Sequence, residues 1–145
     1  MKVFVSSSWR NASQPAVVQA LRAAGHDVYD FRDPAGDSSQ AGFSWTEVDV
    51  KADDWTAAKL RDALTHPRVE EAFSFDRNAL RDCDALVMLQ PCGRSAALEL
   101  GWAAGAGKPT IVLLADGEPE LMLKLADYFC LTIEEVIHHL NNLSS

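Results

Sequence analysis

A single glutamate stands out in the sequence because the helix predicted around it is otherwise almost entirely apolar. In residues 95–106, Ser95 and Glu99 are the only polar side chains besides an indole, and their spacing places them on one helix face. A carboxylate in apolar surroundings is costly, so it indicates either a hydrogen-bonding or charged partner or a functional role. Near a helix N-terminus and in a dry cleft, it can stay ionised and attack the anomeric carbon of a sugar. The residues also allow a purely structural role, in which Glu99 satisfies a neighbouring arginine or hydroxyl.

The rest of this helix predicts close packing on more than one side. Ala97, Gly101 and Gly105 recur every four residues, which leaves a smooth stripe where another backbone can approach. Each glycine inside a helix lowers the stability of the helix by up to about 1 kcal/mol relative to alanine. The glycines of this stripe therefore indicate close packing against another element. We therefore expect the helix to be buried against the sheet, with Trp102 in the core. We also expect the chain to form a homodimer or a higher homo-oligomer.

Apolar runs typical of buried strands alternate along the chain with segments of helical periodicity. Strands are predicted at 2–5, 27–31, 85–89 and 110–115. Helices are predicted at about 15–24, 53–65, 67–82, 95–106 and 132–143, with a loop rich in Gly, Ser, Asp and Pro at 33–42. This alternation predicts one α/β domain over residues 1–145, a flavodoxin-like (Rossmann-like) three-layer sandwich with a mostly parallel sheet.

Such a sheet directs the search for a binding site to two loops. Ligands of open α/β sheets bind beyond the carboxyl ends of the strands, at the switch point between the first and third strands. Residues 6–11 and 90–95 occupy that place here, and both stretches are small and polar. The candidate substrate contacts of small size are Ser7, Ser8, Gly93 and Ser95.

Three arginines fall at predicted carboxyl ends of strands, where they make a local positive cluster in an acidic chain. These are Arg10, Arg32 and Arg94. Arg94 and Ser95, with the free N–H groups at a helix start, can form a phosphate-binding site. The arginines can equally pair with the aspartates of residues 30–37, in which case they bind no ligand.

Aromatic side chains in polar loops provide a second kind of contact. Trp9, Phe43 and Trp45 lie in segments that need no aromatics for solubility, and they can stack on the base of a nucleotide. Cys92 lies in one of the two candidate loops, but no histidine is predicted nearby, so we expect an unreactive thiol.

Composition and charge exclude several classes of partner and cofactor. The formal net charge of −8 disfavours DNA or RNA as a partner, because a polyanion would be repelled. The cysteines and histidines show no metal-binding spacing, so we expect no metal and no cofactor. The N-terminus is too short and polar for a signal peptide, and no apolar run is long enough to cross a bilayer. We therefore expect a cytoplasmic protein with reduced thiols and no membrane contact, whose ligand is a small molecule.

The segment around the glutamate also carries a resemblance to a known family. Residues 92–103 have the sequence Cys-Gly-Arg-Ser-Ala-Ala-Leu-Glu-Leu-Gly-Trp-Ala, followed by Gly-Lys-Pro at 107–109 and an apolar strand. This pattern, with its E-L-G-x-A signature after a strand and a short glycine-containing loop, resembles the nucleoside 2-deoxyribosyltransferase family, which includes deoxynucleoside 5′-monophosphate N-hydrolases. Weaker similarity covers most of the chain. Residues 4–9 are similar to the family's first strand and turn, and residues 75–87 to its aspartate-bearing helix and third strand.

The resemblance implies roles for individual residues. Glu99 corresponds to the family's nucleophile, which forms a covalent glycosyl-enzyme. Asp76 corresponds to the aspartate that assists at the sugar and the leaving base. The family's tyrosine that hydrogen-bonds the nucleophile is represented by Phe4, which has no hydroxyl. Gly93 stands where some transferases have an aspartate.

The resemblance thus implies cleavage of the N-glycosidic bond of a (deoxy)nucleoside or nucleoside monophosphate. A second base that resolves the glycosyl-enzyme would make the protein a transferase, and water would make it a hydrolase. Two other interpretations stay open. One is a non-catalytic nucleotide-binding or sensing module, which the missing tyrosine hydroxyl allows. The other is an NAD-cleaving glycohydrolase, in which a helical glutamate is also used.

Overall fold

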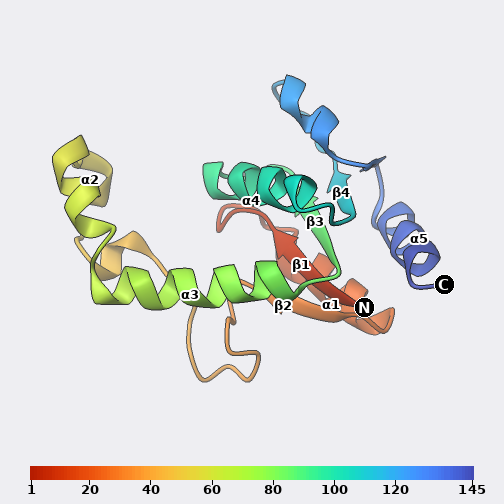
Figure 1. Ribbon diagram of the computed structural model, residues 1–145, viewed down its shortest axis with the longest axis horizontal. Helices are drawn as coiled ribbons and strands as arrows, with labels where there is room; N and C mark the ends of the chain where they lie inside the picture. The colour runs from red at the N-terminus through yellow and green to blue at the C-terminus, as the bar shows by residue number, and fades with distance from the viewer.

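The central sheet of the computed structural model, which describes residues 1–145, consists of five parallel strands (Figure 1). Their spatial order is β2-β1-β3-β4-β5, the flavodoxin-like order predicted from the alternation of elements. The carboxyl ends of β1 and β3 therefore lie side by side, as the site prediction requires. The strands are β1 (Lys2–Ser6), β2 (Asp27–Asp30), β3 (Ala85–Leu89), β4 (Thr110–Leu113) and β5 (Tyr128–Cys130).

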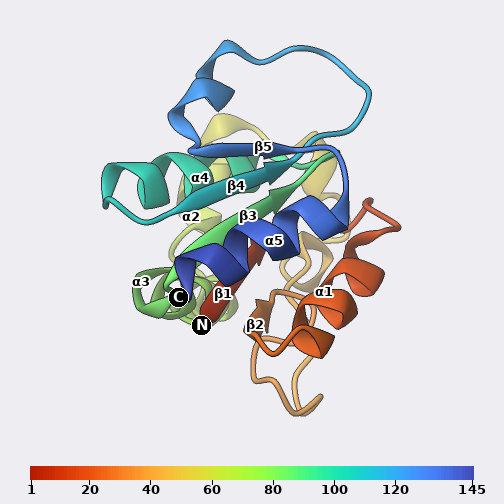
Figure 2. The same cartoon turned by 90° about the vertical axis from the view of Figure 1, so that its right-hand side faces the viewer.

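Helices cover both faces of the sheet and complete three layers (Figure 2). α1 (Gln14–Ala23) and α5 (Ile133–Leu143) lie on one face, and α3 (Pro67–Asp82) and α4 (Arg94–Gly105) lie on the other. The buried side chains form one cluster on each side, because successive residues of a strand point to opposite faces. The predicted three-layer sandwich is confirmed.

The alternation along β1 decides which of its side chains can reach the site. Val3 and Val5 are buried against α1 and α5, whereas Phe4 is buried on the side of α3 and α4. Ser6 follows Phe4 by two residues, so it faces the same side at the carboxyl end of the strand. Tyr29 of β2 is in register with Phe4 and also packs on this side.

Two details of the predicted elements are wrong, and both concern short segments. The helix expected from Asp53 or Asp54 begins later, because residues 52–54 form a 3-10 turn and Trp55 and Thr56 are extended. α2 (Ala57–Ala63) starts after Thr56, whose hydroxyl accepts from the Lys59 N–H. β5 was not expected, since a strand of three residues carries almost no periodic signal.

The outer face of α4 is more exposed than its composition predicts. Ala96, Leu100 and Ala103 are buried against the sheet, but Trp102 is 47% exposed, so its expected place in the core is wrong. A Cβ atom added at Gly101 would meet nothing within 4 Å, and neither would one at Gly105. The glycine stripe therefore packs against nothing within the chain. None of the helices has the length and apolar character needed to span a membrane.

Candidate active site

A cleft of about 820 Å³ opens at the carboxyl end of the sheet. Its walls come from the loops after β1, β2 and β3 and from α3 and α4. Of the site residues predicted from the sequence, all but Arg32 line this cleft: Ser7, Ser8, Trp9, Arg10, Phe43, Trp45, Asp76, Gly93, Arg94, Ser95 and Glu99. The fold thus brings together residues that lie up to about ninety positions apart in the chain.

Glu99 faces the cleft from the second turn of α4, and Ser6 holds one of its oxygens. The Ser6 hydroxyl donates to Glu99 Oε2 at 2.5 Å. This contact forms because α4 packs its buried face against β1 and β3, above the side on which Ser6 points. Phe4 has no hydroxyl with which to bond Glu99. Ser6, two residues further along the same strand, supplies that hydroxyl instead.

The surroundings of Glu99 make it a weaker acid than an ordinary glutamate. Burial raises the pKa of Glu99 to about 7, the bond from Ser6 opposes this rise, and the nearby charge of Asp76 adds to it. The helix N-terminus, which was expected to help keep Glu99 ionised, does not outweigh burial, and Glu99 is only partly ionised around neutral pH. Glu99 lies beyond the first turn, where the helix dipole has little effect, so the cost of removing a charge from water is the larger contribution.

Replacing Glu99 with glutamine should stabilise the folded protein at neutral and alkaline pH. The pKa of Glu99 is about 7 in the fold against an ordinary 4.5, so the folded state holds the proton more tightly. The wild type therefore loses stability as the pH rises from 4.5 to about 7. Above that window the loss reaches at most about 3 kcal/mol, since one pKa unit corresponds to about 1.4 kcal/mol.

Urea unfolding at several pH values measures this effect. The variant should unfold with the larger free energy at about pH 8, and the two proteins should be equal near about pH 4. Glu118→Gln, which removes an exposed loop carboxylate, is the control and should follow the wild type. A gain for Glu99→Gln that is the same at every pH would contradict the assignment to a desolvated charge.

Asp76 faces the same cleft from α3, next to Ala72 and Phe75. The hydroxyl of Tyr29 donates to Asp76 Oδ1 at 2.6 Å. Burial raises the pKa of Asp76, and the hydrogen bond from Tyr29 lowers it. Two partly buried carboxyl groups from different helices therefore share one cleft, and each accepts a hydrogen bond from a hydroxyl of the sheet.

The three predicted arginines divide into two kinds. Arg10 and Arg94 line the cleft, and neither guanidinium makes a hydrogen bond or an ion pair. Arg32 points elsewhere. Its Nη2 donates to the carbonyls of residues 8, 9 and 11 at 3.0–3.3 Å, and its guanidinium lies 5.1 Å from the centre of the Trp9 ring. Arg32 therefore shapes the loop after β1 and does not line the cleft, and none of the three guanidinium groups pairs with an aspartate.

The start of α4 is open toward the cleft. Gly93 is its N-cap and provides no side-chain cap, and the first turn contains no acidic residue. Three other helices, α2, α3 and α5, have an N–H group of the first turn capped by a side chain. Because the free N–H groups of a helix start favour anions, this end of the cleft suits a phosphate or a carboxylate.

The predicted aromatic residues form one wall of the cleft. Trp9 Nε1 donates to the Phe43 carbonyl at 3.1 Å, and the ring centroids of Phe43 and Trp45 are 5.0 Å apart. Gly42 permits this arrangement, because a Cβ atom there would collide with the Phe31 carbonyl oxygen and lie 2.6 Å from Trp9 Cζ2. Trp9 remains 51% exposed, so its ring is free to contact a ligand.

Three residues that shape the site were not singled out from the sequence, although Ser6 begins the predicted binding loop 6–11. Ser6 and Tyr29 could have been found, since the alternation along each strand places them on the side of Phe4. Arg68 carried no such signal. Its Nε donates to Glu47 Oε1 at 3.0 Å and its guanidinium lies 5.5 Å from the Phe43 ring centre, so it ties the aromatic loop to α3.

No protein-family model matches the sequence, and no curated protein matches it. Among solved structures, a 2-deoxyribosyltransferase from Bacillus psychrosaccharolyticus is 20% identical, covers 94% of this chain and 90% of its own, and has a TM-score of 0.56. The CMP N-glycosidase of Clostridium botulinum is 17% identical, covers 97% and 98%, and has a TM-score of 0.54. A conserved protein from Enterococcus faecalis is 14% identical, covers 98% of both chains, and has a TM-score of 0.61.

These likenesses extend over nearly the whole length of both chains, and two of the three similar structures are of enzymes whose names denote glycosyl transfer or N-glycosidic cleavage. The fold that the resemblance implied is therefore confirmed. The chain adopts the same three-layer α/β fold as a 2-deoxyribosyltransferase and a CMP N-glycosidase.

Proposed function

We propose that this protein is an enzyme that cleaves the N-glycosidic bond of a nucleoside or a nucleoside monophosphate, through a covalent glycosyl intermediate on Glu99. The observation that carries the proposal is the pair of carboxyl groups, Asp76 and Glu99, which face one cleft from two helices. Burial raises the pKa of both groups, that of Glu99 to about 7, so the pair can hold one proton and one negative charge between them. The sequence resemblance and the shared fold support the same reaction class.

The residues of the cleft can be assigned to the two halves of a retaining displacement. An oxygen of Glu99 bonds to the anomeric carbon while the bond to the base nitrogen breaks. The electron pair passes to the base, which takes a proton from Asp76. Water or a second base then attacks the anomeric carbon, releases Glu99, and returns a proton to Asp76. Ser6 holds Oε2 throughout, which leaves Oε1 free to attack the sugar.

Two groups of residues in the cleft suit the two ends of a nucleotide. Arg10 and Arg94 have unpaired guanidinium groups, and they lie in the same cleft as Ser95 and the open start of α4, where a 5′-phosphate can bind. The wall of Trp9, Phe43 and Trp45 can stack on a base, whatever its identity. We therefore assign the phosphate to the first group and the base to the second.

Arg94→Ala should raise KM for nucleoside monophosphates by about tenfold to a hundredfold, the effect expected for a lost charge-assisted hydrogen bond. It should change KM for the corresponding nucleoside much less, since no phosphate is present. Steady-state kinetics with the two substrates in parallel measures the difference. Arg61→Ala, on the exposed surface of α2, is the matched control and should alter neither value. An equal rise in KM for both substrates would show that Arg94 does not bind the phosphate.

A product panel tests the reaction itself. The protein is incubated with nucleosides, deoxynucleotides and NAD, with and without a second free base, and the products are separated by chromatography. Free base alone indicates hydrolysis, and a swapped base indicates transfer; either supports N-glycosidic cleavage of nucleosides. Release of nicotinamide alone would instead indicate an NAD-cleaving enzyme. Tight binding of a nucleotide without any turnover would indicate a binding or sensing module, and both of these results would contradict the proposal.

We also propose that the chain forms a homodimer or a higher homo-oligomer through the outer face of α4. Leu98 is 76% exposed and Trp102 is 47% exposed on this face, beside the two glycines that contact nothing within the chain. A contiguous apolar surface with room for close backbone approach suits a second copy better than it suits water. Sedimentation equilibrium measures the assembly state, and a monomer at micromolar concentration would contradict this assignment.

A further inference from the structure

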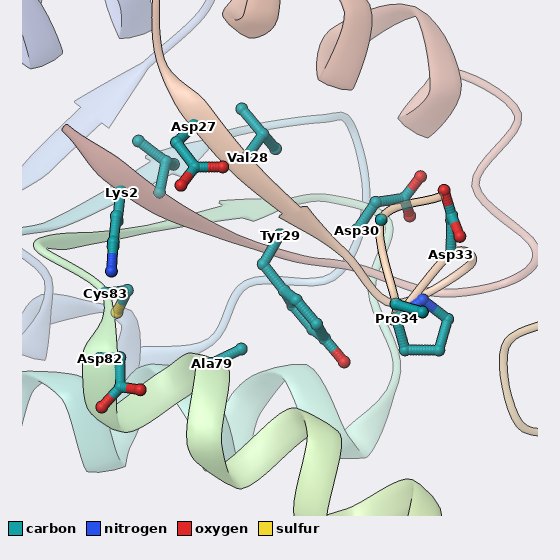
Figure 3. Close-up of a pocket in the computed structure, with 13 residues that line it drawn as sticks. Lys2, Asp27, Val28, Tyr29, Asp30, Asp33, Pro34, Ala79, Asp82 and Cys83 are labelled. Carbon is teal, nitrogen blue, oxygen red and sulfur yellow. The ribbon is translucent and has the colours of Figure 1, made fainter. Parts of the chain in front are cut away.

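Tyr29 lies where β2 faces α3, and it acts on the cleft through its hydroxyl. It stacks on Phe4 of β1, with ring centroids 5.1 Å apart and an interplanar angle of 25°. Its ring belongs to the wall of a second, smaller cavity of about 290 Å³, and the phenol reaches from β2 toward α3 (Figure 3). The hydroxyl donates to Asp76 Oδ1 at 2.6 Å. Tyr29 therefore lines the smaller cavity and is joined to the larger cleft by its hydrogen bond to Asp76.

We propose that Tyr29 is a positioning residue for Asp76: its hydroxyl holds one carboxyl oxygen, so that the other carries the proton which the leaving base receives. The inference rests on the proposed function, in which Asp76 is the general acid. A carboxyl oxygen that accepts from a phenol is not the oxygen that bears the proton of a neutral carboxyl group. In the neutral form of Asp76 the proton is therefore on Oδ2, and the hydrogen bond selects the oxygen that serves the base.

The phenol suits this role because it remains protonated. Burial, the charge of Asp76 and the hydrogen bond to it raise the pKa of Tyr29 above its ordinary value, and the charges of Glu99 and Asp30 raise it further. The hydroxyl therefore donates to Asp76 at every pH at which Asp76 itself gains or loses a proton. Stacking on Phe4 keeps the ring in one orientation, so the direction of the hydrogen bond is also constant.

The same bond influences which carboxyl group of the pair is protonated. Burial raises the pKa of Asp76 and of Glu99, and the charge of Asp76 raises that of Glu99 further, so the two groups titrate as a pair. The reaction requires Glu99 ionised and Asp76 neutral. The Tyr29 hydroxyl opposes the rise in the pKa of Asp76, because it stabilises the carboxylate that remains once the proton has passed to the base. The other charged or titratable groups on the walls of the cleft are Arg10, Asp53, Arg68, Cys92 and Arg94.

Tyr29 neither gains nor loses a proton in the step that it assists. The bond between the anomeric carbon and the base nitrogen breaks, and its electron pair goes to the base. The base nitrogen takes the proton from Asp76 Oδ2, while an oxygen of Glu99 bonds to the anomeric carbon. The negative charge left on Asp76 is then stabilised by the hydrogen bond from the phenol.

The pH profile of kcat/KM in Tyr29→Phe tests this role. Without the phenol, Asp76 holds its proton more tightly, so the alkaline limb should move to higher pH by about one unit. Also, kcat should fall by about tenfold because the carboxyl group loses its orientation, with little change in KM. Tyr128→Phe is the matched control, since the only other tyrosine packs on His139 at the opposite face of the sheet. A Tyr29→Phe profile that superimposes on that of the wild type overturns the inference.

Titration of the phenol itself separates failure of this inference from failure of the proposed function, because it requires no substrate. In Tyr128→Phe, Tyr29 is the remaining tyrosine, and its phenolate absorbance should be absent from the native protein at about pH 10, the ordinary pKa of tyrosine. Adding Asp76→Asn should bring ionisation to lower pH. Ionisation at about pH 10 without that change overturns the inference, whatever the enzyme does. If the phenol behaves as expected and wild type cleaves no nucleoside or nucleotide, the proposed function has failed and the catalytic role of Tyr29 falls with it.

Discussion

Replacement of Glu99 by glutamine should lower kcat/KM for the cleaved nucleoside or nucleotide by about a thousandfold or more. An amide is a far weaker nucleophile than a carboxylate, so the covalent step is lost while the size of the side chain is retained. Ser6 can still donate to the amide oxygen, which keeps the cleft in shape. The rate of base release measures the loss, and the intact mass after an acid quench should reveal a glycosyl adduct on the wild type and none on Glu99→Gln.

The control for this variant is again Glu118→Gln, whose exposed carboxylate lies outside the cleft lining. It should retain full activity and form the same adduct as the wild type. A loss of less than about tenfold in Glu99→Gln, which is under about 1.4 kcal/mol of barrier, would show that another group attacks the sugar. The nucleophilic role of Glu99 would then be wrong, although its burial and its hydrogen bond to Ser6 would remain facts of the fold.

Replacement of Asp76 by asparagine should lower kcat by about a hundredfold to ten-thousandfold, the range of a lost general acid. The loss should depend on the leaving base. A nucleoside of 7-methylguanine already carries a positive charge on the base, so it leaves without a proton from the enzyme. With that substrate the variant should approach the wild type, whereas an ordinary purine or pyrimidine nucleoside should show the full effect.

Rates for the two kinds of substrate, measured with wild type and variant, give this comparison directly. Asp53→Asn is the matched control, because Asp53 also lines the cleft but is exposed and makes no side-chain hydrogen bond. It should affect both substrates equally and weakly. If Asp76→Asn loses the same factor with both substrates, Asp76 orients the sugar and is not the acid.

Much of the fold could be predicted from local patterns. The apolar runs of β3 and β4, the capped start of α5 at Thr132 and the glycine after α1 are all signals carried by neighbouring residues. The flavodoxin-like strand order was expected from the alternation of strands and helices. The elements that were missed or misplaced are short. In β5 and at the start of α2 there are too few residues for a period to emerge, and packing decides the conformation.

The site could be predicted in outline because open α/β sheets place ligands at a known edge. This rule brought the loops around Trp9 and Arg94 into one cleft, and the resemblance added Asp76 and Glu99. Side-chain direction was harder to predict. Arg32 lies at the expected end of β2, yet its guanidinium is taken up by backbone carbonyls of the neighbouring loop. An arginine beside a loop satisfies whichever acceptors lie closest, and the sequence does not contain those distances.

The amino-acid sequence alone determined the layers of this protein, the edge of the sheet at which its polar loops gather, and the presence of one carboxylate in an apolar helix. These features depend on periods of two and 3.6 residues, which are local properties of the chain. Only the tertiary structure decided which hydroxyl holds which carboxyl group. The Ser6–Glu99 bond joins residues 93 positions apart, and the Tyr29–Asp76 bond joins residues 47 apart. Such pairs form only when a helix docks on the sheet at one particular depth and rotation, which the packing of the whole core sets.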